Sequence, residues 1–250
     1  MSESRRKKRK LSRSKVTISK LTFHKLDWLE YVTMGLGIWF LIYPKPYTIL
    51  FTALLCMPVL GLILNGLTGR PSIASLVEIS EDKDGDDKYD VADFIDFAAW
   101  IIFIRVLIDF EVESFYSLLL PGTIAFSIML IVLFTTHKII ENSTKSKAWI
   151  YLSLLANVCV YSYAGTYGAN CVYDNSTPTI YHAKVVDKRV RVSRKGRKTY
   201  YVKVTPWGHH YDREEISVAQ NQYNRIKIDE TVEIDLKKGL FTIPWYYIEK

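Results

Sequence analysis

Long apolar runs dominate the middle of the chain. The clearest run covers residues 47–67 and contains no charged side chain. As a helix it would be about 31 Å long, at about 1.5 Å per residue, and the hydrocarbon core of a bilayer is about 30 Å thick. Residues 114–136 and 148–173 contain two similar runs. Helices of this length that are apolar on every face are typical of membrane proteins, so the pattern predicts an integral membrane protein.

Two further segments have a weaker apolar signal. Residues 28–43 form a short run with aromatic residues at both ends, which suits the two interfaces of a bilayer. Residues 91–110 are apolar in the centre and charged toward both ends. This segment is therefore either a further span or an amphipathic helix that lies in the interface. With it included, the predicted spans are 28–43, 47–67, 91–110, 115–136 and 148–170.

The distribution of basic residues favours the five-span interpretation. Of the 33 Lys and Arg residues, 10 lie in residues 1–27, and the formal net charge is +7. Five spans place this basic tail and two basic loops on one side, and they leave the short connections on the other side acidic or nearly uncharged. Because loops rich in Lys and Arg stay in the cytoplasm, we predict a cytoplasmic N-terminus and an extracytoplasmic C-terminus. The tail can also contact anionic lipid, and a nucleic-acid-binding role for it is less favoured.

The C-terminal part changes to the alternating pattern of β-strands. Thr179–Val192 and Lys198–Thr205 flank a basic turn that contains Gly196, which predicts a β-hairpin. Three shorter strands are predicted at Glu215–Ala219, Thr231–Leu236 and Phe241–Ile248. Five short strands in this length indicate a small SH3-like or OB-like barrel. The predicted fold class is therefore a membrane α-helical bundle (residues 28–173, after a tail at 1–27) with a small all-β domain (residues 176–250).

This C-terminal part also resembles a known group of proteins. The sequence AKVVDKRVRVSRKGRKTYYVKV, followed by TVEIDLKKGLFTIPWYYI, is similar to the C-terminal β domain of uncharacterised bacterial inner-membrane proteins. Their domain ends in a pattern of the form v-x-l-x-x-G-x-x-G-x-x-W-Y. Gly239 matches the first glycine, whereas Thr242 stands where the second often lies, and Asp229-Glu230 replaces the usual Gly-Asp. The resemblance implies a location in the bacterial envelope and no particular activity.

Four charged residues in the ambiguous segment are the first candidates for function: Asp93, Asp96, Arg105 and Asp109. An arginine at the centre of a membrane helix costs about 2.5–3.5 kcal/mol on insertion scales. Asp109 lies four residues on, on the same helical face, and can neutralise it in part, whereas Asp96 falls on the opposite face. These residues either line an ion or proton path or form a structural pair with acids near the interface, and the structural interpretation is favoured.

A second candidate is the tip of the predicted hairpin, where an anion or a partner could bind through Arg194, Lys195, Arg197, Lys198, Tyr200 and Tyr201. Outside the cytoplasm, the anions within reach would be lipid headgroups or acidic envelope polymers. The histidines near Trp207 do not predict a metal site, because adjacent histidines on a strand point to opposite faces. No cofactor motif stands out.

Two function classes remain. The first is a non-enzymatic envelope protein whose membrane helices anchor a partner-binding extracytoplasmic β domain. The alternative is a small transporter or channel centred on Asp96 and Arg105. No catalytic nucleophile is recognisable, so we expect a protein that is not an enzyme. Small residues in the last span, at Ala164-x-x-x-Gly168 and Gly165-x-x-x-Ala169, suit close helix packing within the bundle or in a homo-oligomer.

Overall fold

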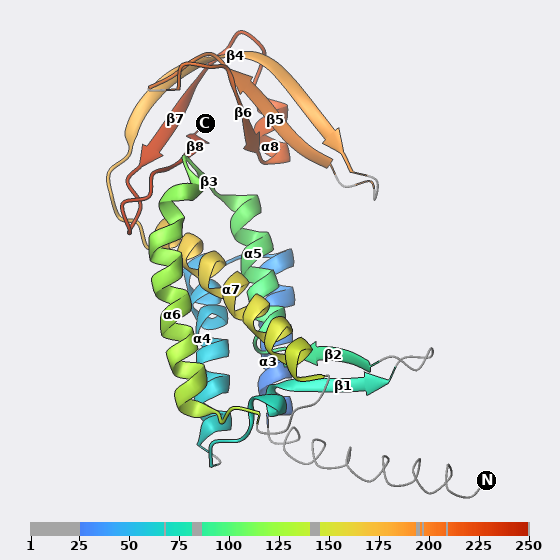
Figure 1. The fold of residues 1–250 in the computed structure, drawn as a ribbon. Coiled ribbons are helices and arrows are strands. Elements are labelled where there is room, and N and C mark those ends of the chain that lie inside the picture. The colour runs from blue at the N-terminus through green and yellow to red at the C-terminus, as the bar shows by residue number, and fades with distance from the viewer. Residues whose placement is uncertain are drawn as a thin grey trace, which may run out of the picture. The chain divides into compact units, whose positions relative to one another are not determined.

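The computed structural model of the chain describes residues 26–67, 69–81, 87–140, 146–193, 196, 198–208 and 210–249 (Figure 1). The chain divides into two compact units. Unit 1 comprises Met1–Arg105 and Gly122–Thr166, and unit 2 comprises Val106–Pro121 and Tyr167–Lys250. Both units therefore draw on two separate parts of the chain.

The described residues form six α-helices: α3 (Asp27–Ile42), α4 (Tyr47–Gly66), α5 (Asp96–Asp109), α6 (Leu119–Thr136), α7 (Ser146–Val172) and α8 (Gln220–Arg225). Among them, three are long and apolar enough to cross a membrane: Tyr47–Gly66, Phe115–Thr136 (where the 3-10 helix η3, Phe115–Leu118, leads into α6) and Lys147–Val172. These three helices fit a membrane-associated protein.

The α3 helix packs closely in unit 1 at one of its two glycines. A Cβ atom added to Gly37 would lie 2.5 Å from the Phe97 ring on α5, whereas one added to Gly35 would meet nothing within 4 Å. Gly61 on α4 is held still more tightly against the ring of Phe94, which precedes α5. Small residues let two backbones approach, and here they make room for phenylalanine rings.

The helices α4, α6 and α7 contact one another in the same way. A Cβ atom on Gly122 would meet the Tyr163 ring at 2.5 Å, and one on Gly165 would meet Leu55 at 2.7 Å. The hydroxyl groups of Tyr163 and Thr123 lie 2.8 Å apart and form a hydrogen bond between α7 and α6. Gly165, from the predicted small-residue pattern, thus packs within this chain.

Unit 1 also contains a short two-stranded sheet and a buried polar cluster. Strand β1 (Val77–Glu81) follows the 3-10 helix η2 (Ile73–Leu76) and pairs antiparallel with β2 (Asp87–Val91). At the end of α4, the Asn65 amide nitrogen lies 3.1 Å from Nε2 of His137 and 3.2 Å from the Ser75 hydroxyl. His137 is almost fully buried, so these bonds satisfy polar groups that water does not reach.

Unit 2 is built on a six-stranded antiparallel sheet (Figure 1). Its strands are β3 (Glu111–Val112), β4 (Thr179–Val192), β5 (Lys198–Val204), β6 (Glu214–Val218), β7 (Thr231–Lys237) and β8 (Trp245–Glu249), in the order β3-β8-β7-β4-β5-β6. The sheet curls into a nearly closed, barrel-like form. Its core is formed by Ala183, Val185, Val202, Val204, Trp207, Ile216, Ile226, Val232, Ile234, Tyr246 and Ile248.

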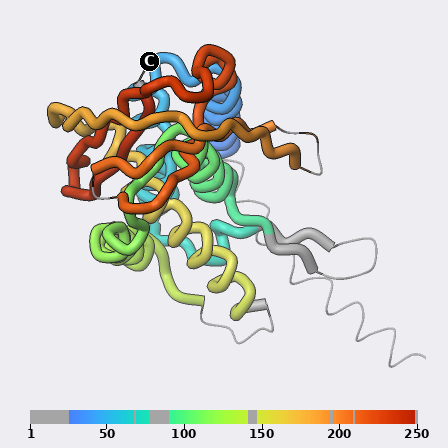
Figure 2. The backbone as a smooth tube through the Cα atoms, turned by 90° about the horizontal axis from the view of Figure 1, so that it is seen from above, coloured from blue at the N-terminus to red at the C-terminus, as the bar shows by residue number. Residues whose placement is uncertain are grey.

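The alternation along the strands explains this core. On β5 the side chains of Val202 and Val204 are buried, while those between and before them are partly exposed. On β7 the same holds for Val232 and Ile234. Successive side chains of a strand point to opposite faces, so each strand gives one face to the core. The predicted hairpin is confirmed: β4 and β5 pair from Val185 and Val204 to the far end, with a bulge after Val185. Figure 2 shows β4 as one long orange path.

The predicted fold class, a membrane helical bundle with a small SH3-like or OB-like barrel, is wrong. The sheet has six strands, and one of them, β3, comes from residues 111–112, far upstream of the others. A strand of two residues has no alternation that a sequence could show. The support for a membrane bundle is also weak, because α3 and α5 have 16 and 14 residues. Helices of these lengths reach roughly 24 and 21 Å, less than the hydrocarbon core.

Candidate functional site

The outer face of the β4–β5–β6 strands carries an exposed arginine pair. Arg189 and Arg191 lie two residues apart on β4, so both point to the same side, away from the core. Their side chains are 62% and 55% exposed. Arg189 pairs with Tyr201 on β5, and β5 in turn pairs with β6. We call Arg189, Arg191, Tyr201 and Glu215 the arginine face.

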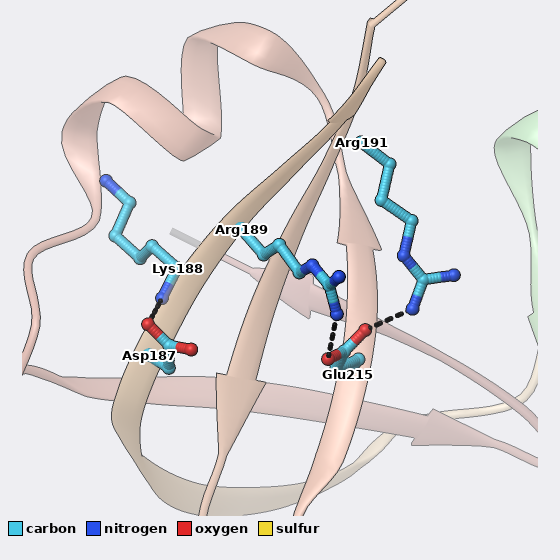
Figure 3. A network of polar contacts seen from close by, with 5 residues as sticks. All are labelled: Asp187, Lys188, Arg189, Arg191 and Glu215. Atoms are coloured by element: carbon cyan, nitrogen blue, oxygen red, sulfur yellow. Dashed lines mark hydrogen bonds and ion pairs between the residues drawn. The ribbon is translucent and has the colours of Figure 1, made fainter. Parts of the chain in front are cut away.

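Glu215 on β6 holds both guanidinium groups (Figure 3). Arg191 donates a hydrogen bond of 2.7 Å to Glu215 Oε2, and a nitrogen of Arg189 lies 3.9 Å from Glu215 Oε1. The guanidinium carbon of Arg191 also lies 4.7 Å from the centre of the Tyr201 ring. A carboxylate between exposed arginines contributes little to stability, about 0–1 kcal/mol for each pair. One carboxylate for two guanidinium groups leaves this face positively charged.

The charges next to the arginine face do not change its sign. Asp187 and Lys203 are paired residues on β4 and β5, and their charges are opposite. Beyond Arg191, residues 192–198 contain four further basic residues and no acidic one in the sequence. Planar guanidinium groups bind carboxylate and phosphate groups through two parallel hydrogen bonds. The face is therefore suited to bind an anion in place of Glu215.

Lys188 lies between these residues in sequence but points to the other side of β4, as Figure 3 shows. Its ammonium group donates hydrogen bonds to the backbone oxygens of Tyr223 and Ile226, the second at 2.6 Å. It also lies 4.2 Å from the centre of the Tyr223 ring. These oxygens are at the C-terminal end of α8, where a positive charge is favourable. Lys188 is thus a structural residue, whereas Arg189 and Arg191 beside it are exposed.

The predicted tip residues fall into two groups. Arg194, Lys195 and Arg197 lie outside the described residues. Of the others, Lys198 is exposed and pairs with Val192 at the far end of the hairpin. The two tyrosines separate: Tyr201 belongs to the arginine face, whereas Tyr200 lies on the opposite face, with its ring 5.1 Å from that of Tyr223. The sequence pointed to the turn, but it did not single out Arg189, Arg191 and Glu215.

The charged residues of the ambiguous segment occupy the two ends of α5. Asp93 lies in the turn before the helix, and Asp96 is its first residue, where a negative charge favours helix formation. Arg105 lies nine residues further on, about 14 Å along the axis, and its guanidinium carbon is 5.9 Å from the centre of the Phe40 ring. Asp109 ends the helix. The structure therefore does not bring Asp96 and Arg105 together, and pairing of Arg105 with Asp109 stays a prediction.

An acidic and aromatic cluster lies at the gap between β6 and β8, in unit 2. The Tyr246 hydroxyl donates to Glu214 Oε1 at 2.6 Å, and Trp207 Nε1 lies 3.2 Å from the other oxygen of Glu214. The ring nitrogen Nδ1 of His210 is 3.3 Å from the same carboxylate. Burial, together with the bond to Glu214, raises the pKa of Tyr246 well above its ordinary value, so this phenol stays a hydrogen-bond donor.

Glu111 on β3 extends this cluster. Its Oε1 accepts a hydrogen bond of 3.3 Å from the backbone nitrogen of Ser217. Burial raises the pKa of Glu111, the bond from Ser217 lowers it, and the nearby charge of Glu214 raises it further, with a net increase. Side chains thus connect β6 to β3 and β8, where the described strands form no backbone ladder that would close the sheet. Within the part of the chain that the structure describes, no group of His, Cys, Asp and Glu residues is arranged to hold a metal ion.

A comparison of the chain with protein-family models, with curated proteins and with solved structures finds no match.

Proposed function

We propose that this chain is a non-enzymatic, membrane-anchored binding protein. Its apolar helices hold unit 2 at the membrane, and the arginine face binds a partner that carries carboxylate or phosphate groups. The observation that carries the proposal is the exposed pair Arg189 and Arg191, which shares the single carboxylate of Glu215. Arginine and tyrosine are enriched where proteins bind their partners.

The β4–β5 hairpin offers a second kind of contact next to these charges. Val190 and Val192 alternate with the arginines along β4 and are 37% and 61% exposed. Their positions place them on the face opposite to Arg189 and Arg191. The exposed valines therefore add apolar contact area beside the arginines, which suits a partner such as an acidic protein segment or an envelope polymer.

The location follows from the helices and the basic tail. An odd number of spans places the two termini on opposite sides, and this holds for three spans as for five. With the ten basic residues of positions 1–27 in the cytoplasm, unit 2 lies outside it. The resemblance of residues 183–248 to bacterial inner-membrane proteins supports the inner membrane as the site.

The test is binding of the full-length protein, in detergent or nanodiscs, to immobilised polyglutamate and polyphosphate. The double variant Arg189→Gln with Arg191→Gln should bind at least about tenfold more weakly, which corresponds to about 1.4 kcal/mol. The matched control is Arg225→Gln with Lys227→Gln, which removes two exposed basic residues elsewhere in unit 2 and should retain most of the binding. Equal loss of binding in both double variants, or no loss in the first, would contradict the proposal. The polymer that the native protein binds more tightly identifies the preferred anion.

A further inference from the structure

The turn between β7 and β8 is bound to the last turn of α7 through one asparagine. Asn170 is fully buried. Its backbone oxygen accepts a hydrogen bond of 3.0 Å from the nitrogen of Leu240, and its side-chain oxygen accepts one of 2.9 Å from the nitrogen of Phe241. The side-chain nitrogen donates to the backbone oxygen of Ile243 at 2.9 Å. Every polar atom of the Asn170 side chain is therefore used to hold this turn.

Asp174, four residues further on, holds the two sides of the same turn. Its Oδ2 accepts hydrogen bonds from the Gly239 backbone at 2.9 Å and from Trp245 Nε1 at 2.8 Å. The ammonium group of Lys237 donates to the Asp174 backbone oxygen at 3.0 Å. Gly239 has a φ of +76°, and a Cβ atom there would lie 2.5 Å from Asn170. The close approach and the positive φ both require glycine, so the turn is fixed to α7.

The outer side of this fixed turn is apolar. Leu240 and Phe241 are 49% and 42% exposed, whereas Ile243, three residues after Leu240, is buried. Lys238, just before the turn, is also exposed. A turn with two large exposed apolar side chains beside a lysine has the composition of a segment that enters the interface of a membrane.

The start of the Phe115–Thr136 span has the same character. Phe115 and Tyr116 are 60% and 85% exposed, and the centre of the Phe115 ring lies 6.0 Å from that of Tyr167 on α7. Aromatic side chains at the end of a span are typical of the membrane–water interface. Both apolar sets in unit 2 are thus attached to the end of a helix long enough to cross a membrane.

The length of α7 indicates the depth at which the turn lies. The apolar segment Lys147–Val172 has 26 residues, about 39 Å as a helix. A hydrocarbon core of about 30 Å leaves its ends in the interface. Asn170 lies near that end, and because its side chain is fully buried, its polar atoms need partners within the protein, which the turn provides.

From these observations we propose that Leu240 and Phe241 insert into the lipid headgroup region at the end of α7, and that the β7–β8 turn holds the sheet against the bilayer. The occupant of this apolar surface is the lipid bilayer itself. The inference rests on the proposed membrane anchoring, because α7 must cross the bilayer for its end to lie in the interface. It adds a lipid-binding surface that is distinct from the arginine face.

The experiment places one fluorophore at a time on the full chain, in vesicles of phosphatidylcholine and phosphatidylglycerol. Cys56→Ala and Cys159→Ala remove the accessible native thiols, and Cys171 is buried. An environment-sensitive dye on Phe241→Cys is then exposed to lipids with a quencher near the headgroup, to lipids with a quencher near the chain end, and to iodide in the water. Leu240→Cys provides a second position if the first variant folds poorly. Tyr211→Cys, at a residue 88% exposed, is the aqueous control, and Ile128→Cys on α6 is the control for a span.

We expect the dye at position 241 to be quenched by the shallow lipid quencher at least about twofold more than by iodide, as for side chains that insert roughly 5–10 Å. Position 211 should respond to iodide alone, and position 128 to the deep quencher. If position 128 responds to the deep quencher while both 240 and 241 respond only to iodide, the inference is wrong and the membrane anchoring stands. If position 128 responds only to iodide, the anchoring itself fails and the inference fails with it. Protection of position 241 from all three quenchers indicates cover by protein and also overturns the inference.

Discussion

Neighbouring residues of β4 show how one basic sequence serves two purposes. Lys188 turns inward to the end of α8, and Arg189 turns outward to Glu215 (Figure 3). Successive side chains of a strand point to opposite faces, which gives the two basic residues different roles. Amino-acid composition alone does not distinguish them. Two carboxyl groups of unit 2 also differ in their surroundings: Asp174 is buried and accepts several hydrogen bonds, whereas Glu111 is partly buried and accepts one from the Ser217 backbone.

Lys188→Met should lower the free energy of unfolding by about 1.5–3 kcal/mol, the range for hydrogen bonds to a charged group. The change keeps most of the apolar stem and leaves the Tyr223 and Ile226 oxygens without the ammonium group. The control is Lys184→Met, whose exposed ion pair with Asp229 spans 2.9 Å and should cost less than about 1 kcal/mol. Denaturant unfolding in detergent measures both, and equal costs would contradict the assigned role of Lys188.

Asp174→Asn should remove a stabilising contribution that depends on pH. Burial alone would raise the pKa of Asp174, but hydrogen bonds from Ser176, Trp245 and Gly239 outweigh it and hold the pKa below its ordinary value. The carboxylate therefore stabilises the fold above the unfolded pKa of about 3.9, and this contribution is lost as the pH falls through the lower native pKa. The difference in unfolding free energy between the native chain and Asp174→Asn should shrink as the solution is acidified. A difference that stays constant with pH would refute the charged form as the one that is bound.

Glu111→Gln should show the opposite trend. The pKa of Glu111 is raised, chiefly by burial, so the charged form is disfavoured in the folded state. Folded Glu111 binds a proton more readily than unfolded Glu111, and stability falls as the pH rises through the raised pKa. The amide can still accept the hydrogen bond from Ser217. The variant should therefore be more stable than the native chain at neutral pH and no more stable in acid; a loss of stability at neutral pH would contradict this.

Among the elements, close packing depends on which face of a helix a glycine occupies. The α3 helix contains Gly35 and Gly37, but only Gly37 packs against α5. A pattern of small residues indicates that a helix packs closely against a neighbour. Which of these residues makes the contact depends on the neighbouring helix and on the angle at which the two helices cross. The pairing of the short strand β3 with Tyr246 and Trp245 is likewise not predictable from the sequence, because two residues are too few to show an alternating pattern.

Gly37→Ala should lower the unfolding midpoint of the protein in detergent, because the new methyl group would meet the Phe97 ring at 2.5 Å. Overpacking of this kind typically costs about 1–3 kcal/mol. Gly35→Ala has open space around it and should be neutral or more stable by up to about 1 kcal/mol, the difference in helix propensity. Thermal unfolding of the two variants side by side checks the helix contact, which would be disproved if Gly37→Ala were the more stable of the two.

For the whole molecule, the sequence predicts the regular elements better than their assembly. The apolar lengths of α4, α6 and α7 and the alternation of β4, β5 and β7 are visible because each depends on local periodicity. The contribution of residues 106–121 to unit 2, and the bonds from Asn170 and Asp174 to the β7–β8 turn, join segments that are distant in the sequence. Asn170 and Asp174 lie four residues apart at the end of an apolar run. This spacing is the one feature of the sequence that indicates two polar side chains on the same side of the chain there. The sequence shows the basic stretch that contains Arg189 and Arg191. The contact of these arginines with Glu215 depends on the register of β4, β5 and β6, which the sequence does not show.

We propose that apolar helices anchor unit 2 on the side of the membrane opposite to the basic N-terminal tail. The most direct measurement is a reporter fused after Lys250 in the full chain and expressed in bacteria, with one reporter that is active only in the cytoplasm and one that is active only outside it. We expect a membrane-bound fusion with activity from the external reporter alone, since both three and five spans place the two termini on opposite sides. Activity from the cytoplasmic reporter, or recovery of the fusion in the soluble fraction, would contradict it.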